Sequence, residues 1–291
     1  MTTVRVAAPA KVNLALHVTG QRQDGYHLID SLVAFAPVHD RLAIRSGASL
    51  ELAVTGPESA MVPTGTQNLA LQAASLVQGD TGSSLLIEKF LPVAAGIGGG
   101  SADAAAVLRG LAPQSRDLPA IARNALALGA DLPMCLACRP CRVGGIGEEI
   151  TFVDLPTLPA LLVNPRTPVS TARVFARLAR RDNPQMPRNL PSARDARGVI
   201  QWLSEQRNDL EPVALEEAPV IADVLAMLRT SPGCGLARVS GSGATCFGLF
   251  DDERLARDAE VRIAARRPDW WLASGQLGDQ SELATPRVCQ D

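Results

Sequence analysis

Lysine, tyrosine and histidine are scarce in this chain of 291 residues, which has 28 basic residues, one tyrosine and three histidines. Only Lys11 and Lys89 are lysines, so arginine is the usual cation. The net charge is −2 and no basic run occurs, which argues against nucleic acid or an anionic membrane surface as a partner. No apolar run approaches ~20 residues, and the first residues lack a signal-peptide pattern. We therefore expect a cytoplasmic protein whose partner is a small molecule.

Cysteine is also too sparse for a disulfide framework, because six cysteines are spread over the whole length. This usage fits reduced thiols in a cytosol. Cys135, Cys138 and Cys141 in "CLACRPC" begin like a bacterial iron–sulfur run, but no fourth cysteine follows at the required spacing. We therefore interpret them as small apolar residues of a buried segment, with an iron–sulfur or zinc site as the less favoured alternative.

The 46% hydrophobic content allows a substantial core, and the order of elements predicts an α+β protein. Pro156 and Pro159 flank a probable linker, so we place one domain over residues 1–155 and another over 156–291. Alternating apolar residues predict strands at 4–18, 50–54, 84–90, 160–164, 236–240, 244–250 and 270–277. Helices are expected at 68–79, 102–111, 118–129, 171–181, 195–205, 218–229 and 252–266. The mixed hairpins and helices argue against a doubly wound parallel sheet.

The stretch "PVAAGIGGGSADAAAVLRGL" places four glycines within the five positions from Gly96 to Gly100, directly before a helix-forming sequence. Such a loop offers mainly backbone N–H groups, and the helix adds the positive end of its dipole, which suits a phosphate. The loop is not a P-loop, because no lysine follows the glycines. A dinucleotide fingerprint also fails, because Asp117 has the required distance but does not follow a strand. A third type of phosphate loop is left.

A few polar residues near this loop are candidates for chemistry. Lys11 and Asn13 alternate along one strand and so share a face. Asp131, just before Leu132 and Pro133, either caps a helix or acts chemically. Ser101 could cap helix 102–111 and could also reach a phosphate-bound magnesium ion. In "VSGSGATCFGLF", Gly241 and Gly243 flank Ser242 and leave backbone free to approach a ligand, although a tight hairpin explains them equally well.

Six stretches together resemble the GHMP kinase superfamily: "PAKVNL", "PVAAGIGGGSADAAAVL", "GADLP", "VNPRTPVSTARVF", "NDLEP" and "VSGSGAT", in this order. "PAKVNL", "DGYH", "GADLP" and "TPVSTARVF" are similar to its branch that phosphorylates the 2-hydroxyl of a cytidine diphosphate-linked methylerythritol, in the non-mevalonate isoprenoid pathway. The resemblance runs through nearly the whole chain. It implies a two-domain GHMP kinase fold, with an N-terminal ribosomal-protein-S5-like ATP-binding domain and a C-terminal ferredoxin-like substrate domain.

The same resemblance implies roles for individual residues. Lys11 and Asp131 would form the catalytic pair, with Asp131 accepting the proton of the hydroxyl and Lys11 orienting the acceptor oxygen. Tyr26 and Phe175 would sandwich the cytosine ring and His27 would contact its polar edge. The substrate would also be bordered by Asn13, Thr171, Gly241, Ser242 and Gly243. ATP phosphates would lie, with Mg²⁺ and with Ser101 near the metal, on the loop made of Pro92, Val93, Ala94, Ala95, Gly96, Ile97, Gly98, Gly99, Gly100, Ser101 and Ala102.

The chain departs from the superfamily in its loop, where Ala94 and Ala95 replace frequent glycines and Ile97 replaces leucine. These are mild changes provided that neither alanine takes a positive φ. Two alternatives stay open beside the metal protein: a sister kinase acting on homoserine, mevalonate or a sugar, and a catalytically silent sensor with this fold. We expect an interdomain cleft, because the motifs lie in both halves. The protein is expected to be a monomer or a homodimer.

Overall fold

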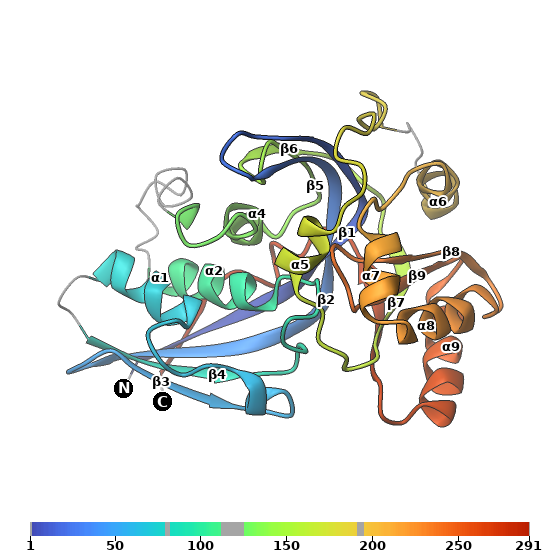
Figure 1. The fold of residues 1–291 in the computed structure, drawn as a ribbon. Helices are drawn as coiled ribbons and strands as arrows, with labels where there is room; N and C mark the ends of the chain where they lie inside the picture. The colour runs from blue at the N-terminus through green and yellow to red at the C-terminus, as the bar shows by residue number, and fades with distance from the viewer. Residues whose placement is uncertain (1, 79–81, 112–124, 191–194, 291) are drawn as a thin grey trace.

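The computed structural model describes residues 2–78, 82–111, 125–190 and 195–290. These residues form two β-sheets with helices packed on them (Figure 1). In the first sheet the strand order is β11-β1-β2-β4-β3, with β5 on β2 and β6 on β5. Only the β3–β4 pair among the described strands is parallel. The strands are β1 (Thr2–Gln21), β2 (His27–Gly47), β3 (Glu51–Thr55), β4 (Gly82–Glu88), β5 (Cys141–Gly144), β6 (Glu149–Phe152) and β11 (Arg287–Gln290).

The helices α1 (Leu69–Gln78) and α2 (Gly99–Leu111) lie over one face of this sheet, with the short α4 (Leu132–Ala137) beside α2 (Figure 1). Alanine dominates α2 because the helix is buried on most sides, and small side chains let it approach its neighbours closely. At Gly110 even a Cβ atom would lie 2.5 Å from Cδ1 of Ile44 on β2. The C-terminal end of α2 is thereby packed closely on β1 and β2.

The second sheet is antiparallel and carries the remaining helices. Its strand order is β10-β7-β9-β8. The strands are β7 (Leu158–Asn164), β8 (Cys234–Val239), β9 (Cys246–Phe250) and β10 (Trp271–Leu277). The helices are α5 (Thr171–Ala176), α6 (Ala196–Ser204), α7 (Glu211–Glu217), α8 (Val220–Arg229) and α9 (Glu253–Arg266). The 3₁₀ turn η1 (Ser59–Met61) belongs to the first half of the chain, between β3 and α1. A third core joins the two sheets, with Val12 and Leu14 of β1 packed near Phe247 and Leu249 of β9.

The α+β class and the two-sheet arrangement confirm the sequence prediction, but several boundaries were wrong. Helix 102–111 begins at Gly99, so Ser101 lies in its first turn and is not its cap. Helix 171–181 ends at Ala176, and strand 84–90 spans Gly82–Glu88. Strands β2, β5, β6 and β11 and helices α4 and α7 were missed, and most of helix 118–129 lies outside the described residues.

The C-terminal strand β11 pairs with β1 in the first sheet, although it follows the whole second half in the sequence. The boundary between residues 155 and 156 stays a prediction. None of the helices within the described residues combines the length and the apolar character needed to cross a bilayer.

Candidate active site

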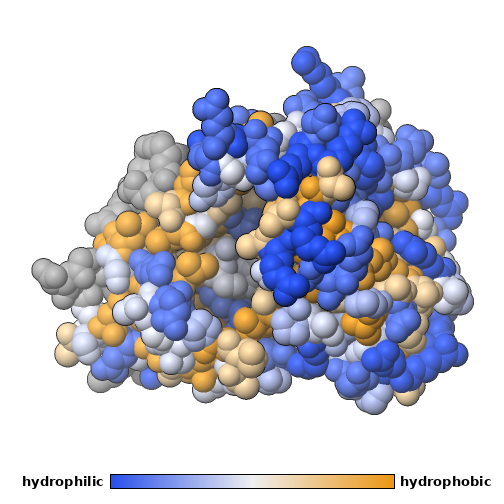
Figure 2. Space-filling view, in the orientation of Figure 1, coloured by the Kyte–Doolittle hydropathy of each residue, from blue (hydrophilic) through white to orange (hydrophobic). Residues whose placement is uncertain are grey.

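A cleft of about 1000 Å³ lies between elements of the two halves. Figure 2 shows this face of the molecule hollowed near its middle, beside the place that α5 occupies in Figure 1. Most of the site residues expected from the sequence line this one cleft: Lys11, Asn13, Tyr26, His27, Ala94, Ala95, Gly96, Gly98, Gly99, Gly100, Ser101, Asp131, Thr171, Phe175, Gly241 and Ser242. Of the remaining ones, Pro92, Val93, Ile97 and Gly243 lie in the loops that form it, and Ala102 lies in the first turn of α2. Motifs scattered over more than 230 residues of sequence thus meet at one place.

At the centre of the cleft, Lys11 and Asp131 form an ion pair, with 3.3 Å between Nζ and Oδ2. The ammonium group also donates to Oδ1 of Asn13 at 2.6 Å, as the shared strand face predicts. Asn13 in turn donates through Nδ2 to the hydroxyl of Ser31 on β2. The lysine side chain is 7% exposed and the aspartate 38%, so the cation is held in place and the carboxylate faces the cleft.

Asp131 does not act as a helix cap. It occupies the N-cap position of α4, yet its side chain makes no capping hydrogen bond, and its φ and ψ of −79° and −15° are helical. A capping aspartate normally has extended backbone and accepts from an N–H of the first turn. Because Pro133 lies in that first turn, one donor is missing there. The carboxylate is directed to Lys11, which favours the chemical role over the structural one.

The glycine loop passes directly over Lys11. Gly96 and Gly98 have φ of 74° and 67°, and a Cβ at Gly98 would lie 2.7 Å from Cγ of Lys11. Within the described residues, the backbone N–H groups from Gly98 to Ser101 donate to no acceptor, as at any uncapped helix start. Unpaired N–H groups at a helix N-terminus favour an anion. The donor set therefore fits the phosphates of a nucleotide, and the Ser101 hydroxyl at the same turn fits a phosphate-bound cation.

One departure from the superfamily pattern is strained. Ala94 has a φ of 52°, in the left-handed region that a glycine adopts readily. The two alanines are mild changes only if neither takes a positive φ. Ala94 does not meet this condition, whereas Ala95 is not among the residues with a positive φ. A left-handed alanine costs roughly 1–2 kcal/mol. The fold sustains this strain at the edge of the phosphate loop, where Ala94 itself is exposed.

The turn between β8 and β9 closes the cleft from the other half. Ser240 links three segments, because its hydroxyl accepts from the backbone N–H of Asn13 and donates to the carbonyl of Gly96. A Cβ at Gly241 would lie 3.1 Å from Oδ1 of Asn13, so only glycine fits there comfortably. Ser242 shares a hydrogen bond of 2.8 Å with the hydroxyl of Thr171. The functional interpretation of this turn thus has direct geometric support.

Two positioning residues of this turn were missed from the sequence. Ser240 belongs to the quoted "VSGSGAT" stretch, but only its neighbours were singled out. Asn208 belongs to "NDLEP", and its amide donates to the carbonyls of Val239 and Gly241 at 2.8 Å each while its oxygen accepts from Leu210. Short polar residues beside glycine-rich turns were the available signal, but their partners lie more than 30 residues away.

The far end of the cleft is aromatic. The rings of His27 and Phe175 lie 5.0 Å apart at an angle of 30°, and Tyr26 is 59% exposed at the rim. Burial, followed by the charge of Arg181, lowers the pKa of His27, so that its ring is neutral at pH 7. Its Nε2 atom is buried and has no hydrogen-bond partner within the described residues. An orphaned ring nitrogen beside the aromatic ring of Phe175 fits the polar edge of a base.

None of the three cysteines of "CLACRPC" lines this cleft, although the backbone N–H of Cys135 donates to the carbonyl of Asp131. Cys135, Cys138 and Cys141 are all buried, as predicted for small apolar residues. Cys138 donates its thiol hydrogen to the carbonyl of Cys135, and burial raises the pKa of Cys141 to about 12. Thiols in this state are inert at neutral pH.

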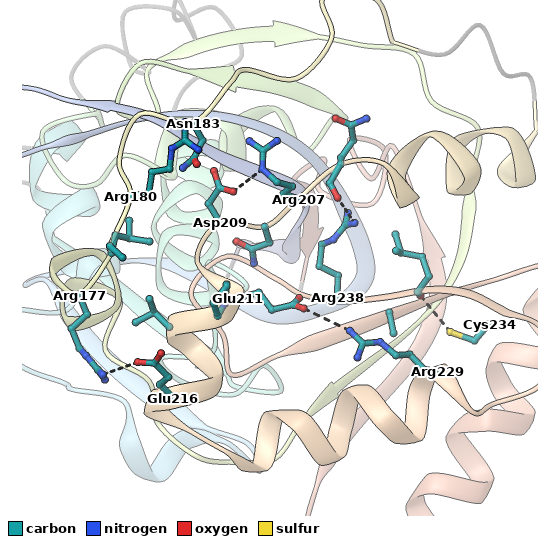
Figure 3. A pocket seen from close by; sticks show the side chains of 18 of the residues that line it. Arg177, Arg180, Asn183, Arg207, Asp209, Glu211, Glu216, Arg229, Cys234 and Arg238 are labelled. Carbon is teal, nitrogen blue, oxygen red and sulfur yellow. Dashed lines mark hydrogen bonds and ion pairs between the residues drawn. The ribbon is translucent and has the colours of Figure 1, made fainter.

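A second cavity, of about 770 Å³, lies behind the turn among α5, α7, α8 and β8 (Figure 3). Its charged side chains pair with one another, as the dashed lines of Figure 3 show for Arg207 with Asp209 and Arg229 with Glu211. Arg238 donates to the carbonyls of Leu14, Leu203 and Gln206. These polar groups are already engaged within the protein, whereas in the first cleft His27 Nε2 and the N–H groups at the start of α2 have no partner within the described residues.

Comparison with known proteins agrees with this geometry. Family models described as the GHMP kinases N-terminal domain and the GHMP kinases C-terminal match residues 68–139 and 189–268. A 4-diphosphocytidyl-2-C-methyl-D-erythritol kinase of Roseobacter denitrificans is 49% identical over 98% of this chain and 97% of its own. The chain belongs to this kinase family. A kinase of the same name from Paracoccus denitrificans is 52% identical over 94% of this chain and 96% of its own.

Solved structures place the fold in the same family. A crystal structure of 4-(cytidine 5′-diphospho)-2C-methyl-D-erythritol kinase has a TM-score of 0.77 at 34% identity and covers 94% of this chain and 99% of its own. A homoserine kinase from Cytophaga hutchinsonii has a TM-score of 0.70 at 16% identity over 99% of this chain and 97% of its own, which shows a shared fold alone. The protein is therefore an ATP-dependent phosphotransferase acting on a hydroxyl of a small molecule.

Proposed function

We propose that the protein transfers the γ-phosphate of ATP to the 2-hydroxyl of 4-diphosphocytidyl-2-C-methyl-D-erythritol. One observation carries the proposal: the Lys11–Asp131 pair lies in one continuous cleft between a loop of free N–H groups and an aromatic end with an unpaired His27 nitrogen. A phosphate donor and a base-bearing acceptor would meet at the central pair. Relatives about 50% identical that carry this name support the same substrate.

The loop from Pro92 to Ala102 would hold the nucleotide's phosphates through the N–H groups at the start of α2. The hydroxyl of Ser101 would help to hold Mg²⁺, and the bound ion would supply neutralisation of the phosphate charge. A Cβ at Gly129 would lie 3.9 Å from the Ser101 hydroxyl, which places this hydroxyl close to the turn that carries Asp131. The donor side and the proton-accepting side of the reaction are therefore adjacent in the cleft.

Asp131 would accept the proton of the attacking hydroxyl, because it is the carboxylate at the centre of the cleft and has no capping duty. Lys11, held by Asn13, would fix the orientation of that carboxylate and of the acceptor oxygen. Phosphoryl transfer needs little further chemistry from the protein, since in-line positioning and charge neutralisation dominate. The two glycine-rich turns, which contact each other through Ser240 and Gly96, would supply that positioning.

His27 would contact the polar edge of the cytosine ring, which would lie between Tyr26 and Phe175. Thr171 and Ser242, which already share a hydrogen bond, would border the same substrate together with Asn13 and the backbone of Gly241 and Gly243. Stacking suits any base, whereas a hydrogen-bonding edge selects one, so His27 would carry the selectivity. We further propose that the enzyme works in the cytoplasm, as a monomer or homodimer, without nucleic acid as a partner.

The experiment is a measurement of ADP release from ATP with magnesium, comparing this alcohol with homoserine, mevalonate and galactose as acceptors. We expect turnover with the cytidine compound and at least a hundredfold lower kcat/KM with the others, because only the first fills the aromatic end. Turnover of another acceptor at a comparable rate would replace the proposal by a sister kinase. Nucleotide binding without turnover of any acceptor would favour a sensor.

A further inference from the structure

Lys89, the other lysine of the chain, lies at the centre of a buried charge cluster beneath the glycine loop. Its Nζ is 2.5 Å from Oδ2 of Asp40 on β2 and 2.6 Å from Oδ2 of Asp103 on α2. The side chains of all three are at most 6% exposed. None of them lines the cleft, so the cluster does not contact a ligand there.

The cluster joins both ends of the phosphate loop. At the entrance, the second oxygen of Asp40 accepts the backbone N–H groups of Phe90 and Leu91 at 2.6 and 2.8 Å. At the exit, Lys89 holds Asp103 in the second turn of α2, and a Cβ at Gly99 would lie 3.2 Å from the ammonium nitrogen. One buried cation therefore ties β2, the entrance and the helix start to a common point.

We propose that Lys89, Asp40 and Asp103 are positioning residues that preset the glycine loop and the N-terminus of α2 for the phosphates of ATP. The inference rests on the proposed function, because it takes this loop as the phosphate site. A helix N-terminus binds an anion only if its N–H groups point to one place. The cluster of Lys89, Asp40 and Asp103, called the clamp below, keeps these N–H groups in that arrangement before the ligand binds. Fewer groups then have to be ordered on binding.

The choice of lysine at this position fits the geometry. The chain uses arginine for nearly every other cation, yet here two carboxylate oxygens and the backbone of Gly99 surround a single point. A compact ammonium with three donors fits such a point, whereas a planar guanidinium needs a wider, flatter space. Lys11 has the same compact shape under the other side of the loop, at Gly98. Both lysines of the sequence thus support the glycine loop.

The net charge of Lys89, Asp40 and Asp103 is compatible with a phosphate bound above them. Two carboxylates face one ammonium, but burial first, and the nearby Asp40 carboxylate further, raise the pKa of Asp103 to about 7 against the lowering effect of Lys89. A protonated Asp103 would leave the cluster neutral below the loop. The unpaired buried Oδ1 of Asp103 is consistent with a carboxyl group that is not held as a full anion.

The test compares Asp103→Ala with Asp103→Asn in the full-length protein, with Ile87→Val as a control for general destabilisation. Alanine releases the helix start from Lys89 but leaves the Lys89–Asp40 pair neutral, so the variant should fold. Asparagine keeps an oxygen for Lys89. Ile87 is buried in β4, which ends just before Lys89, and valine there removes one methylene without touching the cluster. Calorimetric titration with ADP and with a non-hydrolysable ATP analogue, each with magnesium, gives Kd without turnover.

We expect Asp103→Ala to raise the nucleotide Kd about tenfold and Asp103→Asn to stay within about threefold of the parent. Ile87→Val should lower Tm while leaving Kd unchanged, and cytidine 5′-diphosphate should bind all four proteins equally. Equal nucleotide Kd for the parent and Asp103→Ala would overturn the proposal. A parent protein that binds no adenine nucleotide would instead overturn the proposed function, so the two failures are distinguishable. Should Asp103→Ala not fold, Lys89→Arg keeps the charge but not the shape, and parental nucleotide affinity in it would contradict the proposal.

Discussion

The two cavities of the molecule are similar in size, at about 1000 and 770 Å³, and both contain charged side chains. They differ in whether those groups are already engaged. Around the second cavity, arginines pair with carboxylates or donate to carbonyls (Figure 3). In the first, the Nε2 atom of His27 is buried and has no partner within the described residues, and the free N–H groups of the glycine loop belong to residues that line the cleft. Unengaged polar groups, and not cavity volume, therefore locate the site.

The two cavities also differ in backbone conformation, although two further left-handed residues, Cys138 and Arg166, line neither of them. The left-handed Ala94 and the glycines at Gly96, Gly98 and Gly241 all border the first cavity. Backbone conformations of this kind persist where the surrounding structure determines them, and they concentrate at functional sites. Among the described residues that line the second cavity, none has a positive φ.

The largest effect should follow from Asp131→Asn. The amide keeps the shape of the side chain but cannot accept the substrate proton, so we expect kcat to fall by about a thousandfold. Steady-state assays with saturating ATP would measure the change, and circular dichroism would confirm that the variant is folded. A fall of less than tenfold would show that the carboxylate is not the base.

A smaller effect is expected at the aromatic end of the cleft. His27→Phe keeps a ring against Phe175 but removes the nitrogen that has no partner, so the KM for the cytidine substrate should rise about tenfold. The KM for ATP should not change, because His27 is remote from the loop. Equal effects on both KM values would contradict a role in base recognition. Both KM values should be measured at pH 7, because the lowered pKa of His27 keeps its ring neutral in the parent protein at this pH.

The buried carboxylate below the first cavity should also make stability depend on pH. Asp103 has a pKa of about 7 in the folded protein against an ordinary value of 3.8, so the folded state binds more protons between these values. The free energy of unfolding should therefore fall as pH rises from about 4 to 7 and then level off. Denaturant titrations of Asp103→Asn should show a flatter profile over that range. If the free energy of unfolding of Asp103→Asn changed with pH as steeply as that of the parent, the titrating group would be a residue other than Asp103.

The smallest effect should come from the second cavity. Arg229→Met breaks the 3.7 Å ion pair with Glu211, but the arginine side chain is 57% exposed and its pair is screened by water. We expect a loss of less than about 1 kcal/mol of stability and no change in kcat/KM. If Arg229→Met lost activity tenfold, the second cavity would be part of the active site. The distinction between the two cavities would then be wrong.

Local patterns predicted much of this molecule. The alternation along β1 placed Lys11 and Asn13 on one face, and their side chains are hydrogen bonded. The glycines before an alanine-rich helix predicted an anion site, and the loop has the free N–H groups that such a site needs. These predictions succeeded because the relevant partners are near in sequence or follow from strand and helix geometry.

What the sequence could not predict depends on distant partners. In the clamp around Lys89, Asp40 binds the backbone of Leu91 across 51 positions, and Ser240 reaches Asn13 across 227. Asp131 stands where a cap would be expected, and only its distance to Lys11 separates the two roles. The left-handed φ of Ala94 was equally hidden, because alanine gives no sign of a backbone that usually needs glycine.

Hydrogen–deuterium exchange of the intact protein with each ligand tests the central claim most directly. With magnesium and a non-hydrolysable ATP analogue, the account predicts protection of the amides of residues 94–101. With cytidine 5′-diphosphate, it predicts protection of residues 25–29 and 171–175. In both cases residues 206–213 and 234–238, around the second cavity, should exchange as in the free protein. Protection confined to the second cavity by either ligand would contradict the assignment of the first cleft as the active site.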